Sequence, residues 1–322
     1  MSFFILIGIL LVACSAESEF ESELPSSIDR TVLSIQEVPH TEFIEHRIFV
    51  HFLTDSGDSI SFYTDTGGGK IIGRDAVSAL NLRIDSTQGE DRIFEQVNLA
   101  ELFREHNYPP PLEPNFVYDG NMNFKQTIGG LLGAIWFADK VWLFDYKRPS
   151  LSTIDSIDWQ AIESPHKVKI GFMKNEAGQH LTHFPRIPII VAGDTIQTLF
   201  DSGAMVNLQD SSRQRFGGFS VVATSFIVAS MFDAWRDQHP DWPFIDQGDA
   251  NHGEHMIQVP AVEIGGHTVG PVWFTRRADT NFTEFMSQWM DQPIHGAIGG
   301  SCFHYFETLI LDYRNEWAYF ER

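Results

Sequence analysis

Cysteine and basic residues are scarce in this chain, and no long hydrophobic run is present. Its 322 residues include only two cysteines, Cys14 and Cys302, too few for a disulfide framework or a cysteine-rich zinc site. The 22 Lys and Arg are outnumbered by 43 Asp and Glu, and the resulting charge of −21 disfavours nucleic-acid binding. The apolar run 3–13 is shorter than the ~20 residues that a spanning helix needs, and no other stretch is a better candidate.

The remaining composition is that of a folded protein. Hydrophobic residues make up 43% of the chain and charged residues 20%, which argues against a disordered or fibrous class. The length suits one large domain or two of about 150 residues each.

The beginning of the chain has the pattern of an export signal. The apolar run 3–13 ends in Leu-Val-Ala-Cys, which resembles the bacterial lipobox, where cleavage precedes a cysteine that is then lipidated. We therefore expect a signal peptide over 1–13, lipidation at Cys14, and a flexible acidic tether over 14–30. No basic residue precedes the run, so an ordinary signal peptide with an incidental cysteine is the alternative.

The same pattern predicts where the protein resides. A lipid on Cys14 would anchor it in a bacterial cell envelope, and Ser15 beside the cysteine points to the outer membrane. Without the lipid, the protein would be periplasmic or secreted. If Cys14 is lipidated, Cys302 remains as an unpaired, buried thiol.

A motif around an aspartate occurs twice. Asp-Thr-Gly at 65–67 returns 136 residues later as Asp-Ser-Gly at 201–203, and in both copies Gly-Asp and an Ile precede it at the same spacing. Downstream, Gly133 and Gly299 each follow a hydrophobic residue and precede a Phe by four positions. The order is the same in both halves, so the repeated unit is half of the molecule. The halves differ between these points, with 68 residues from Asp65 to Gly133 and 98 from Asp201 to Gly299.

The local pattern around each copy predicts β-structure. The β-rich runs 48–53 and 187–191 lead into Gly-Asp turns, so each return strand should deliver its Asp to a strand end. Buried strands are predicted at 141–144 and 308–311. Short helices are predicted at 75–80, 98–107 and 283–290, and a stronger helix candidate at 220–237.

The duplicated motif resembles the aspartic proteases of the pepsin and retropepsin clan. The resemblance implies a mainly β, two-lobed pepsin-like fold with duplicated β-barrel lobes and a few short helices. The N-terminal lobe would cover 31–150 with Asp65, and the C-terminal lobe 151–322 with Asp201.

The resemblance also assigns roles to the repeated residues. Asp65 and Asp201 would be catalytic, and Gly133 and Gly299 would belong to the element that crosses beneath the catalytic loops. The residues that brace the loops would be Thr66, Gly67, Ser202 and Gly203. No metal or other cofactor is implied. Gly68 departs from the family pattern, because Ser or Ala is usual there.

The chemistry needs both aspartates. Two carboxylates about 3 Å apart cannot both ionise, so they share one proton, as aspartic proteases are known to do. One then acts as general base on a water, while the other donates to the substrate carbonyl oxygen. The sequence thus predicts a monomeric aspartic endopeptidase acting on proteins or peptides.

Other interpretations stay open. A single Asp in such a motif could merely cap a turn. A non-catalytic envelope lipoprotein of the same fold could hold extended peptides, an idea that the Gly-rich loop and a candidate flap at 83–97 without Tyr favour slightly. A metal-dependent hydrolase would need a cluster of ligands, but the pairs His180/His183 and His252/His255 have a spacing of three and lie in loop-like sequence.

Overall fold

A computed structural model describes residues 33–54, 56–89, 93–119, 128–162 and 164–322. The export-signal segment, Cys14 and the acidic tether lie outside the described residues. Within the described part, no helix is both long and apolar enough to cross a membrane.

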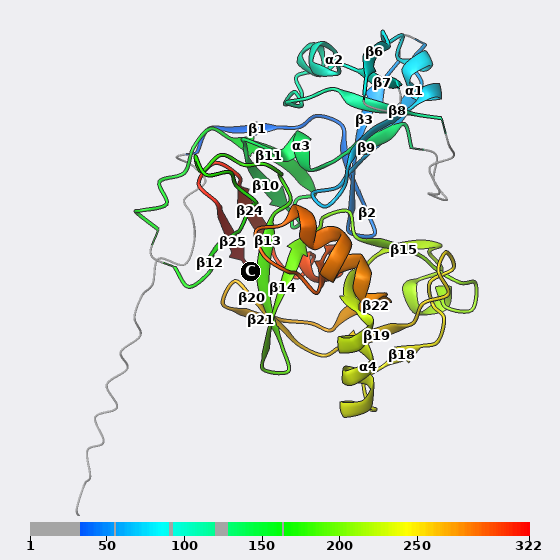
Figure 1. Ribbon diagram of the computed structural model, residues 1–322, viewed down its shortest axis with the longest axis vertical. Coiled ribbons are helices and arrows are strands. Elements are labelled where there is room, and N and C mark those ends of the chain that lie inside the picture. Colours follow the sequence, from blue (N-terminus) through cyan, green and yellow to red (C-terminus); the bar gives the residue numbers. More distant parts are fainter. Residues whose placement is uncertain (1–32, 55, 90–92, 120–127, 163) are drawn as a thin grey trace, which may run out of the picture.

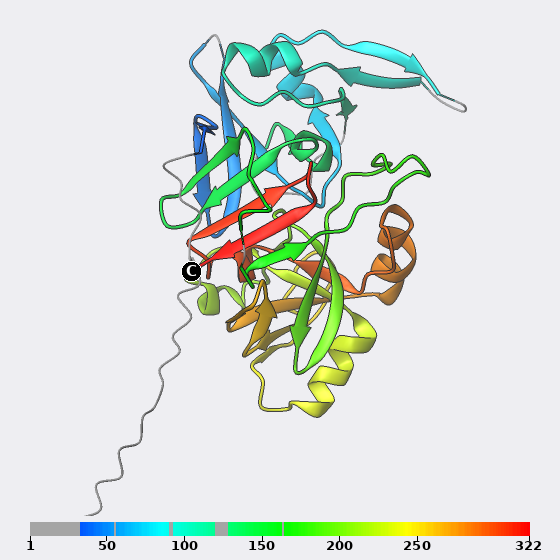
Figure 2. The ribbon, with the colours of Figure 1, turned by 90° about the vertical axis from the view of Figure 1, so that its left-hand side faces the viewer.

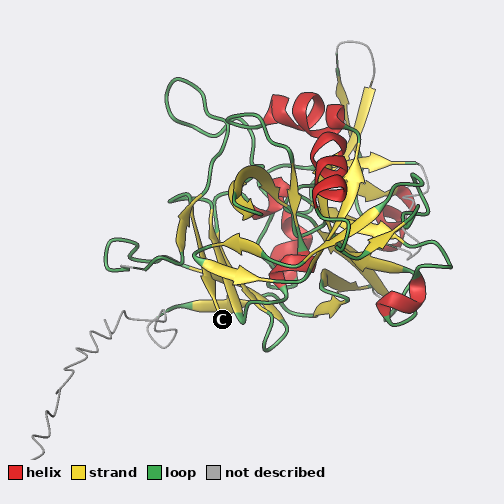
Figure 3. Ribbon diagram, turned by 90° about the horizontal axis from the view of Figure 1, so that it is seen from below, coloured by secondary structure: helices red, strands yellow, loops and turns green. Residues whose placement is uncertain are grey.

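Strands dominate the structure, and the helices between them are short (Figure 3). The N lobe, drawn uppermost in Figure 1, is built on one large sheet. In spatial order its strands are β2 (Thr41–Ile44), β3 (Arg47–Leu53), β4 (Ser59–Thr64), β9 (Gly130–Leu132), β5 (Lys70–Gly73), β8 (Asn115–Tyr118), β7 (Ile93–Val97) and β6 (Asp85–Gln88).

The C lobe has a sheet of its own and a separate hairpin. In spatial order the sheet contains β18 (Phe244–Ile245), β19 (Met256–Val259), β22 (Val272–Arg277), β17 (Ser225–Val228), β23 (Gly296–Ile298), β14 (Asp194–Phe200), β13 (Arg186–Val191), β20 (Val262–Ile264) and β21 (His267–Val269). The hairpin pairs β15 (Met205–Asn207) with β16 (Val221–Ala223).

A third sheet, the joining sheet, connects the lobes (Figure 2). It contains β1 (Ile35–Glu37), β11 (Ser150–Ile154), β10 (Val141–Asp145), β24 (Thr308–Asp312), β25 (Trp317–Glu321) and β12 (Lys167–Lys169). The central pair, β10 and β24, comes from equivalent places in the two halves of the sequence. The two halves are therefore tied together by backbone hydrogen bonds as well as by side chains.

The helical segments are short. They are α1 (Arg74–Ala79), α2 (Ala100–Glu105), α3 (Ala134–Phe137), η2 (Arg213–Phe216), α4 (Ala229–Gln238), η3 (Asn281–Met286), η4 (Ser287–Trp289) and α5 (Gly300–Phe303). Helix α4 lies at the end of the C lobe away from the N lobe (Figure 1).

The strand pairing is duplicated. In the N lobe, β4 runs parallel to β9, β9 antiparallel to β5, and β5 parallel to β8. In the C lobe, β14, β23, β17 and β22 repeat this pattern in the same order and with the same directions. The mainly β, two-lobed fold class predicted from the sequence is therefore confirmed.

One insertion accounts for much of the difference between the halves. Strand β5 begins five residues after Asp65, whereas its counterpart β17 begins 24 residues after Asp201. The intervening segment 204–224 carries β15, η2 and β16, which have no counterpart in the N lobe. The hairpin β15–β16 is thus an addition to the C lobe.

The main core lies against the joining sheet and includes the repeated phenylalanines. Phe137 and Phe303, four residues after the repeated glycines, are both fully buried. Phe303 stacks on Phe200, the residue before Asp201, with ring centroids 4.2 Å apart. The loop that carries Asp201 is therefore packed directly against this core.

The helix predicted at 220–237 was wrong in its first half. Residues Val221–Ala223 and Ser225–Val228 form β16 and β17, and α4 begins only at Ala229. The β-branched residues of 221–228 favour a strand, and β17 is buried between β22 and β23. The remaining predicted strands and helices are present with end points shifted by a few residues, except that the segment predicted at 283–290 is a π-helical turn followed by a 3₁₀ turn.

Candidate active site

Each repeated aspartate directly follows a strand, as the sequence predicts. Asp65 comes after β4 and Asp201 after β14, and the hydrogen bonds of both loops match. The Asp65 N–H donates to the Leu132 carbonyl at 3.0 Å, and the Asp201 N–H donates to the Ile298 carbonyl at 2.9 Å. The two Asp loops are therefore held by the same strands, β9 and β23, that carry the repeated glycines.

The two carboxyl groups meet and share a hydrogen bond. Each also lies against the glycine of the opposite loop. A Cβ atom added to Gly67 would lie 2.7 Å from Asp201 Cγ, and one added to Gly203 would lie 2.1 Å from Asp65 Cγ. Only glycine at these two positions allows the carboxyl groups to approach each other in this way.

Backbone N–H groups orient both carboxylates. The Gly67 N–H donates to Asp65 Oδ1 at 2.9 Å, and the Gly203 N–H donates to Asp201 Oδ1 at 3.0 Å. Each carboxylate thus receives the same bond from the glycine two residues later in its own loop. The site has an approximate two-fold arrangement.

The loops are also locked to each other through two buried hydroxyl residues. The Ser202 N–H donates to Thr66 Oγ1 at 2.9 Å, and the Thr66 N–H donates to Ser202 Oγ at 3.1 Å. Thr66 Oγ1 in turn donates to the Phe200 carbonyl at 2.7 Å. These bonds cross between the lobes and fix the relative position of the two aspartates.

The environment favours a protonated pair. Both carboxylates are half-buried. Burial raises the pKa of Asp65, although hydrogen bonds from Asp201 and from backbone N–H groups lower it in part. Burial, followed by the neighbouring Asp65 charge, raises the pKa of Asp201 well above its usual range. One proton is thus retained between the two groups where isolated carboxyls would have lost theirs.

The repeated glycines downstream pass directly beneath the Asp loops. A Cβ atom on Gly133 would lie 2.0 Å from the Gly69 carbonyl oxygen, and one on Gly299 would lie 2.3 Å from the Thr224 carbonyl oxygen. The Ala134 N–H also donates to the Gly68 carbonyl at 3.0 Å. The structure thus brings the crossing glycines and the aspartates together in both lobes.

The unusual Gly68 has a physical reason. A Cβ atom at this position would lie 2.4 Å from Asp65 Oδ2, whereas Gly69 has open space around it. The counterpart of Gly68 in the C lobe is the buried Ala204. The first loop therefore runs closer to its own carboxylate than the second does.

Sequence reasoning missed Tyr63, which lies two residues before Asp65. Its buried hydroxyl donates to the Gly203 carbonyl at 2.9 Å, so it joins β4 to the opposite loop. Leu199 stands at the equivalent position of the C lobe, so the repeat itself gave no signal for this contact.

The candidate flap forms a hairpin. Strands β6 and β7 pair across the interval 83–97, and the hairpin projects from the N lobe (Figure 2). The turn residues 90–92 lie outside the described residues. Its strand β7 pairs with β8, where Phe94 and Phe116 lie with ring centroids 5.7 Å apart.

The remaining residues that the sequence singled out lie elsewhere. His255 Nδ1 contacts Asp246 at 2.9 Å, and His180 Nε2 contacts Glu316 at 3.1 Å. Within the described ranges, no group of three His, Cys, Asp or Glu is arranged to hold a metal ion. Cys302 is buried, and burial raises the pKa of its thiol.

Among solved structures, the chain is similar to two proteins of comparable length. Against the aspartic proteinase from Irpex lacteus, the identity is 11% and the TM-score 0.48, covering 89% of this chain and 97% of that one. Against basic 7S globulin from soybean, the identity is 9% and the TM-score 0.34, covering 90% of this chain and 95% of that one. No family model and no curated protein sequence matches the chain.

Proposed function

We propose that this protein is an aspartic endopeptidase that uses Asp65 and Asp201 as one catalytic unit. The observation that supports this most is the hydrogen-bonded pair of half-buried carboxyl groups with raised pKa values. One carboxylate would take a proton from a water between the two groups, and the protonated partner would donate to the carbonyl oxygen of the peptide bond. No other group of the protein is needed for this step.

The N lobe offers an apolar surface for an extended substrate. Register pairs place Tyr63, Leu131, Ile71 and Phe116 in a row on one face of the N-lobe sheet. The row is buried at Tyr63, near the aspartates, and exposed at Phe116. An extended peptide lying along this face would have apolar contacts that lead to the catalytic pair.

Substitution of each aspartate tests the proposal. We expect Asp65→Asn and Asp201→Asn each to lower kcat/KM for an unfolded protein by ~10²–10⁴-fold, because Asn cannot accept a proton from water. Asn is nearly isosteric, so the thermal midpoint should change little. The double variant should be hardly slower than either single one, because the residues act together.

Asp145→Asn is the matched control. Asp145 is also a repeated, buried aspartate at a strand end, but its Oδ1 accepts from the Arg148 N–H in the turn after β10, away from the pair. Folded Asp145→Asn protein should keep wild-type activity. Wild-type protein that binds unfolded peptides without cutting them between pH 3 and 8 would favour the alternative, a peptide-holding protein of this fold.

We further propose that Cys14 carries a lipid and anchors the protein in a bacterial envelope. The support is the Leu-Val-Ala-Cys sequence before the Ser- and Glu-rich segment. Two or three acyl chains on one residue would give stable anchoring. Expressed with its full signal, the Cys14→Ser variant should leave the membrane fraction; unchanged membrane association would rule the lipid out.

A further inference from the structure

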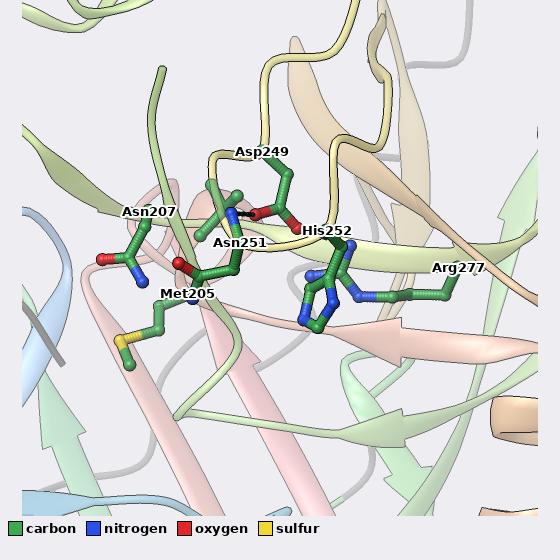
Figure 4. Close-up of a pocket in the computed structure, with 7 residues that line it drawn as sticks. Met205, Asn207, Asp249, Asn251, His252 and Arg277 are labelled. Carbon is green, nitrogen blue, oxygen red and sulfur yellow. Dashed lines mark hydrogen bonds and ion pairs between the residues drawn. The ribbon is translucent and has the colours of Figure 1, made fainter. Parts of the chain in front are cut away.

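A small cavity lies in the C lobe beside the inserted hairpin. It has a volume of about 220 Å³, and its walls come from β15, the loop between β18 and β19, and the end of β22 (Figure 4). Pockets for small molecules usually measure ~300–1,000 Å³, so this one suits a single side chain better than a cofactor. The residues that form it include Met205, Asn207, Asp249, Asn251, His252 and Arg277.

The cavity has a buried charged floor and an exposed polar rim. Asp249 is 1% exposed, and its Oδ2 forms an ion pair with Arg277 Nη1 at 2.9 Å. Its Oδ1 accepts from the Asn251 N–H at 2.8 Å. Asn251 and His252 are exposed at the rim. A buried ion pair adds little to stability compared with apolar packing, so stability alone does not explain its presence at the base of the cavity.

The cavity lies within reach of a substrate held at the aspartates. The Arg277 guanidinium stacks on Phe226 at 4.3 Å, and Phe226 pairs through Ala297 with Leu199, two residues before Asp201. Arg277 itself lies on β22, three strand spacings from β14, which amounts to about 14 Å across the sheet, the length of about four residues of an extended peptide. On the opposite wall, Met205 follows Asp201 by four residues.

The insertion makes the cavity a property of the C lobe alone. Met205 and Asn207 belong to β15, within the segment 204–224 that the N lobe lacks. Part of the longer spacing between Asp201 and Gly299 is therefore the insertion that forms one wall of the cavity. Asn251 and His252 at the rim belong to the loop that also holds His255, and this loop takes no part in the proposed catalytic step.

We propose that this cavity is a substrate subsite for the carboxamide side chain of Gln or Asn, an inference that rests on the proposed peptidase function. The floor places the Arg277 guanidinium beside the Asp249 carboxylate, whose buried Oδ2 accepts no hydrogen bond from the described residues. A carboxamide carries one acceptor and one donor and satisfies both. A Glu side chain would face Asp249 at close range, and a Lys side chain would face Arg277, so each charged ligand meets a like charge.

Peptides that differ at one position test the proposal. In a set of otherwise identical peptides, Gln, Glu, Lys and Leu are placed in turn at each position within four residues of the cleaved bond. At one position we expect kcat/KM to favour Gln over the other three by about tenfold or more. Binding of the same peptides is measured on the Asp201→Asn protein by fluorescence anisotropy, so that recognition is read without cleavage.

Asp249→Asn should reverse the preference. It keeps the Oδ1 acceptor for Asn251 and removes the charge that balances Arg277, so Glu should now be favoured over Gln by about tenfold. Asp233→Asn is the matched control. Asp233 pairs at 3.0 Å with Arg276, the neighbour of Arg277 on β22, but does not line the cavity. The ratio for this control should equal that of the wild type.

Asn251→Asp provides a second variant should Asp249→Asn fail to fold. It adds a carboxylate at the exposed rim, so the preference should move from Gln towards Lys. Cleavage or binding with no position preferring Gln, or with a ratio that neither variant moves, would overturn the subsite. Binding that prefers Gln and shifts as expected, without cleavage by the wild type, would support the subsite and reject the peptidase. Neither binding nor cleavage of any peptide would reject both.

Discussion

At the residue scale, Gly68 and Gly69 in the first Asp loop differ in how much room a side chain would find beside them. A methyl group at Gly68 would lie 2.4 Å from Asp65 Oδ2, whereas at Gly69 it would meet nothing within 4 Å. The carboxylate must therefore rotate or the loop must shift when Gly68 is replaced. Small errors in the position of catalytic groups have large kinetic effects.

We expect Gly68→Ala to lower kcat by about 10²-fold with the protein still folded. Gly69→Ala should keep wild-type activity and raise the free energy of unfolding by about 0.4–1 kcal/mol, because it restricts the unfolded chain. Steady-state kinetics and thermal unfolding on both variants check this. Equal activity of the two variants would show that the Asp65 carboxylate tolerates a neighbour at position 68.

Residues of the site differ in how far the sequence reveals them. Asp65 and Asp201 were found because the same short motif occurs twice with a matching downstream glycine, a pattern that is visible without any structure. Tyr63 was not, because its bond to the Gly203 carbonyl joins residues 140 positions apart and has no counterpart in the other half. The cavity beside the inserted hairpin escaped notice for the same reason, since Asp249 and Arg277 meet only in the folded C lobe.

At the element scale, the two Asp loops form one unit through Thr66 and Ser202. Replacing Thr66 by Val removes the acceptor for the Ser202 N–H and the donor to the Phe200 carbonyl, and both groups would remain buried. Each buried, unsatisfied polar group costs about 1–3 kcal/mol. We expect Thr66→Val to lower the free energy of unfolding by about 2–4 kcal/mol and to reduce kcat as well.

Two controls distinguish the link between the lobes from the loss of any buried hydroxyl. Thr66→Ser keeps the hydroxyl and should stay close to the wild type in both measurements. Thr198→Val removes one buried bond, to the Ile187 carbonyl within the C lobe, and should lower stability while leaving kcat unchanged. Denaturant unfolding and steady-state kinetics give both quantities. A Thr66→Val protein with wild-type kcat would mean that the aspartates need no cross-lobe bracing.

Elements that depend on local chemistry were easier to predict than those that depend on distant partners. The hairpins β3–β4 and β13–β14 follow from Gly-containing turns between β-rich runs. Residues 225–228 became strand β17 because β22 and β23, some 50–70 residues later, pair with it on both sides. The apolar pattern of that segment suits a buried helix equally well, so only its partners decide.

At the scale of the whole molecule, a histidine pair forms part of the contact between the lobes. The turn between β2 and β3 reaches the C lobe, where the rings of His46 and His304 stack with centroids 4.0 Å apart. The Glu45 carbonyl in the same turn accepts from the Ala223 N–H at 3.4 Å. Burial, followed by His304, lowers the pKa of His46 to about 4, and burial lowers that of His304.

These shifts and those of the aspartates act in opposite directions as pH changes. A histidine with a lowered pKa in the folded state binds its proton less readily than in the unfolded chain. Its contribution to stability is therefore lost as pH falls from about 6.5 towards 4. The aspartates have raised pKa values, so they favour the folded state less as pH rises. The shared proton that the proposed catalytic step needs is lost on the alkaline side.

We therefore expect activity to peak on the acid side of neutrality, with an acid limb set by the lobe contact and an alkaline limb set by the aspartates. His46→Asn removes the titrating ring, and Asn tolerates the left-handed backbone that His46 adopts at φ 63°. The fall in thermal midpoint between pH 6.5 and 4 should become shallower in this variant, while the alkaline limb of kcat/KM stays where it was. His40→Asn is the control, because His40 has a similar backbone at φ 50° but is exposed and outside the contact. If the thermal midpoint falls equally between pH 6.5 and 4 in both variants, the acid sensitivity comes from another group. If the alkaline limb of kcat/KM shifts in His46→Asn, the aspartates do not set that limb.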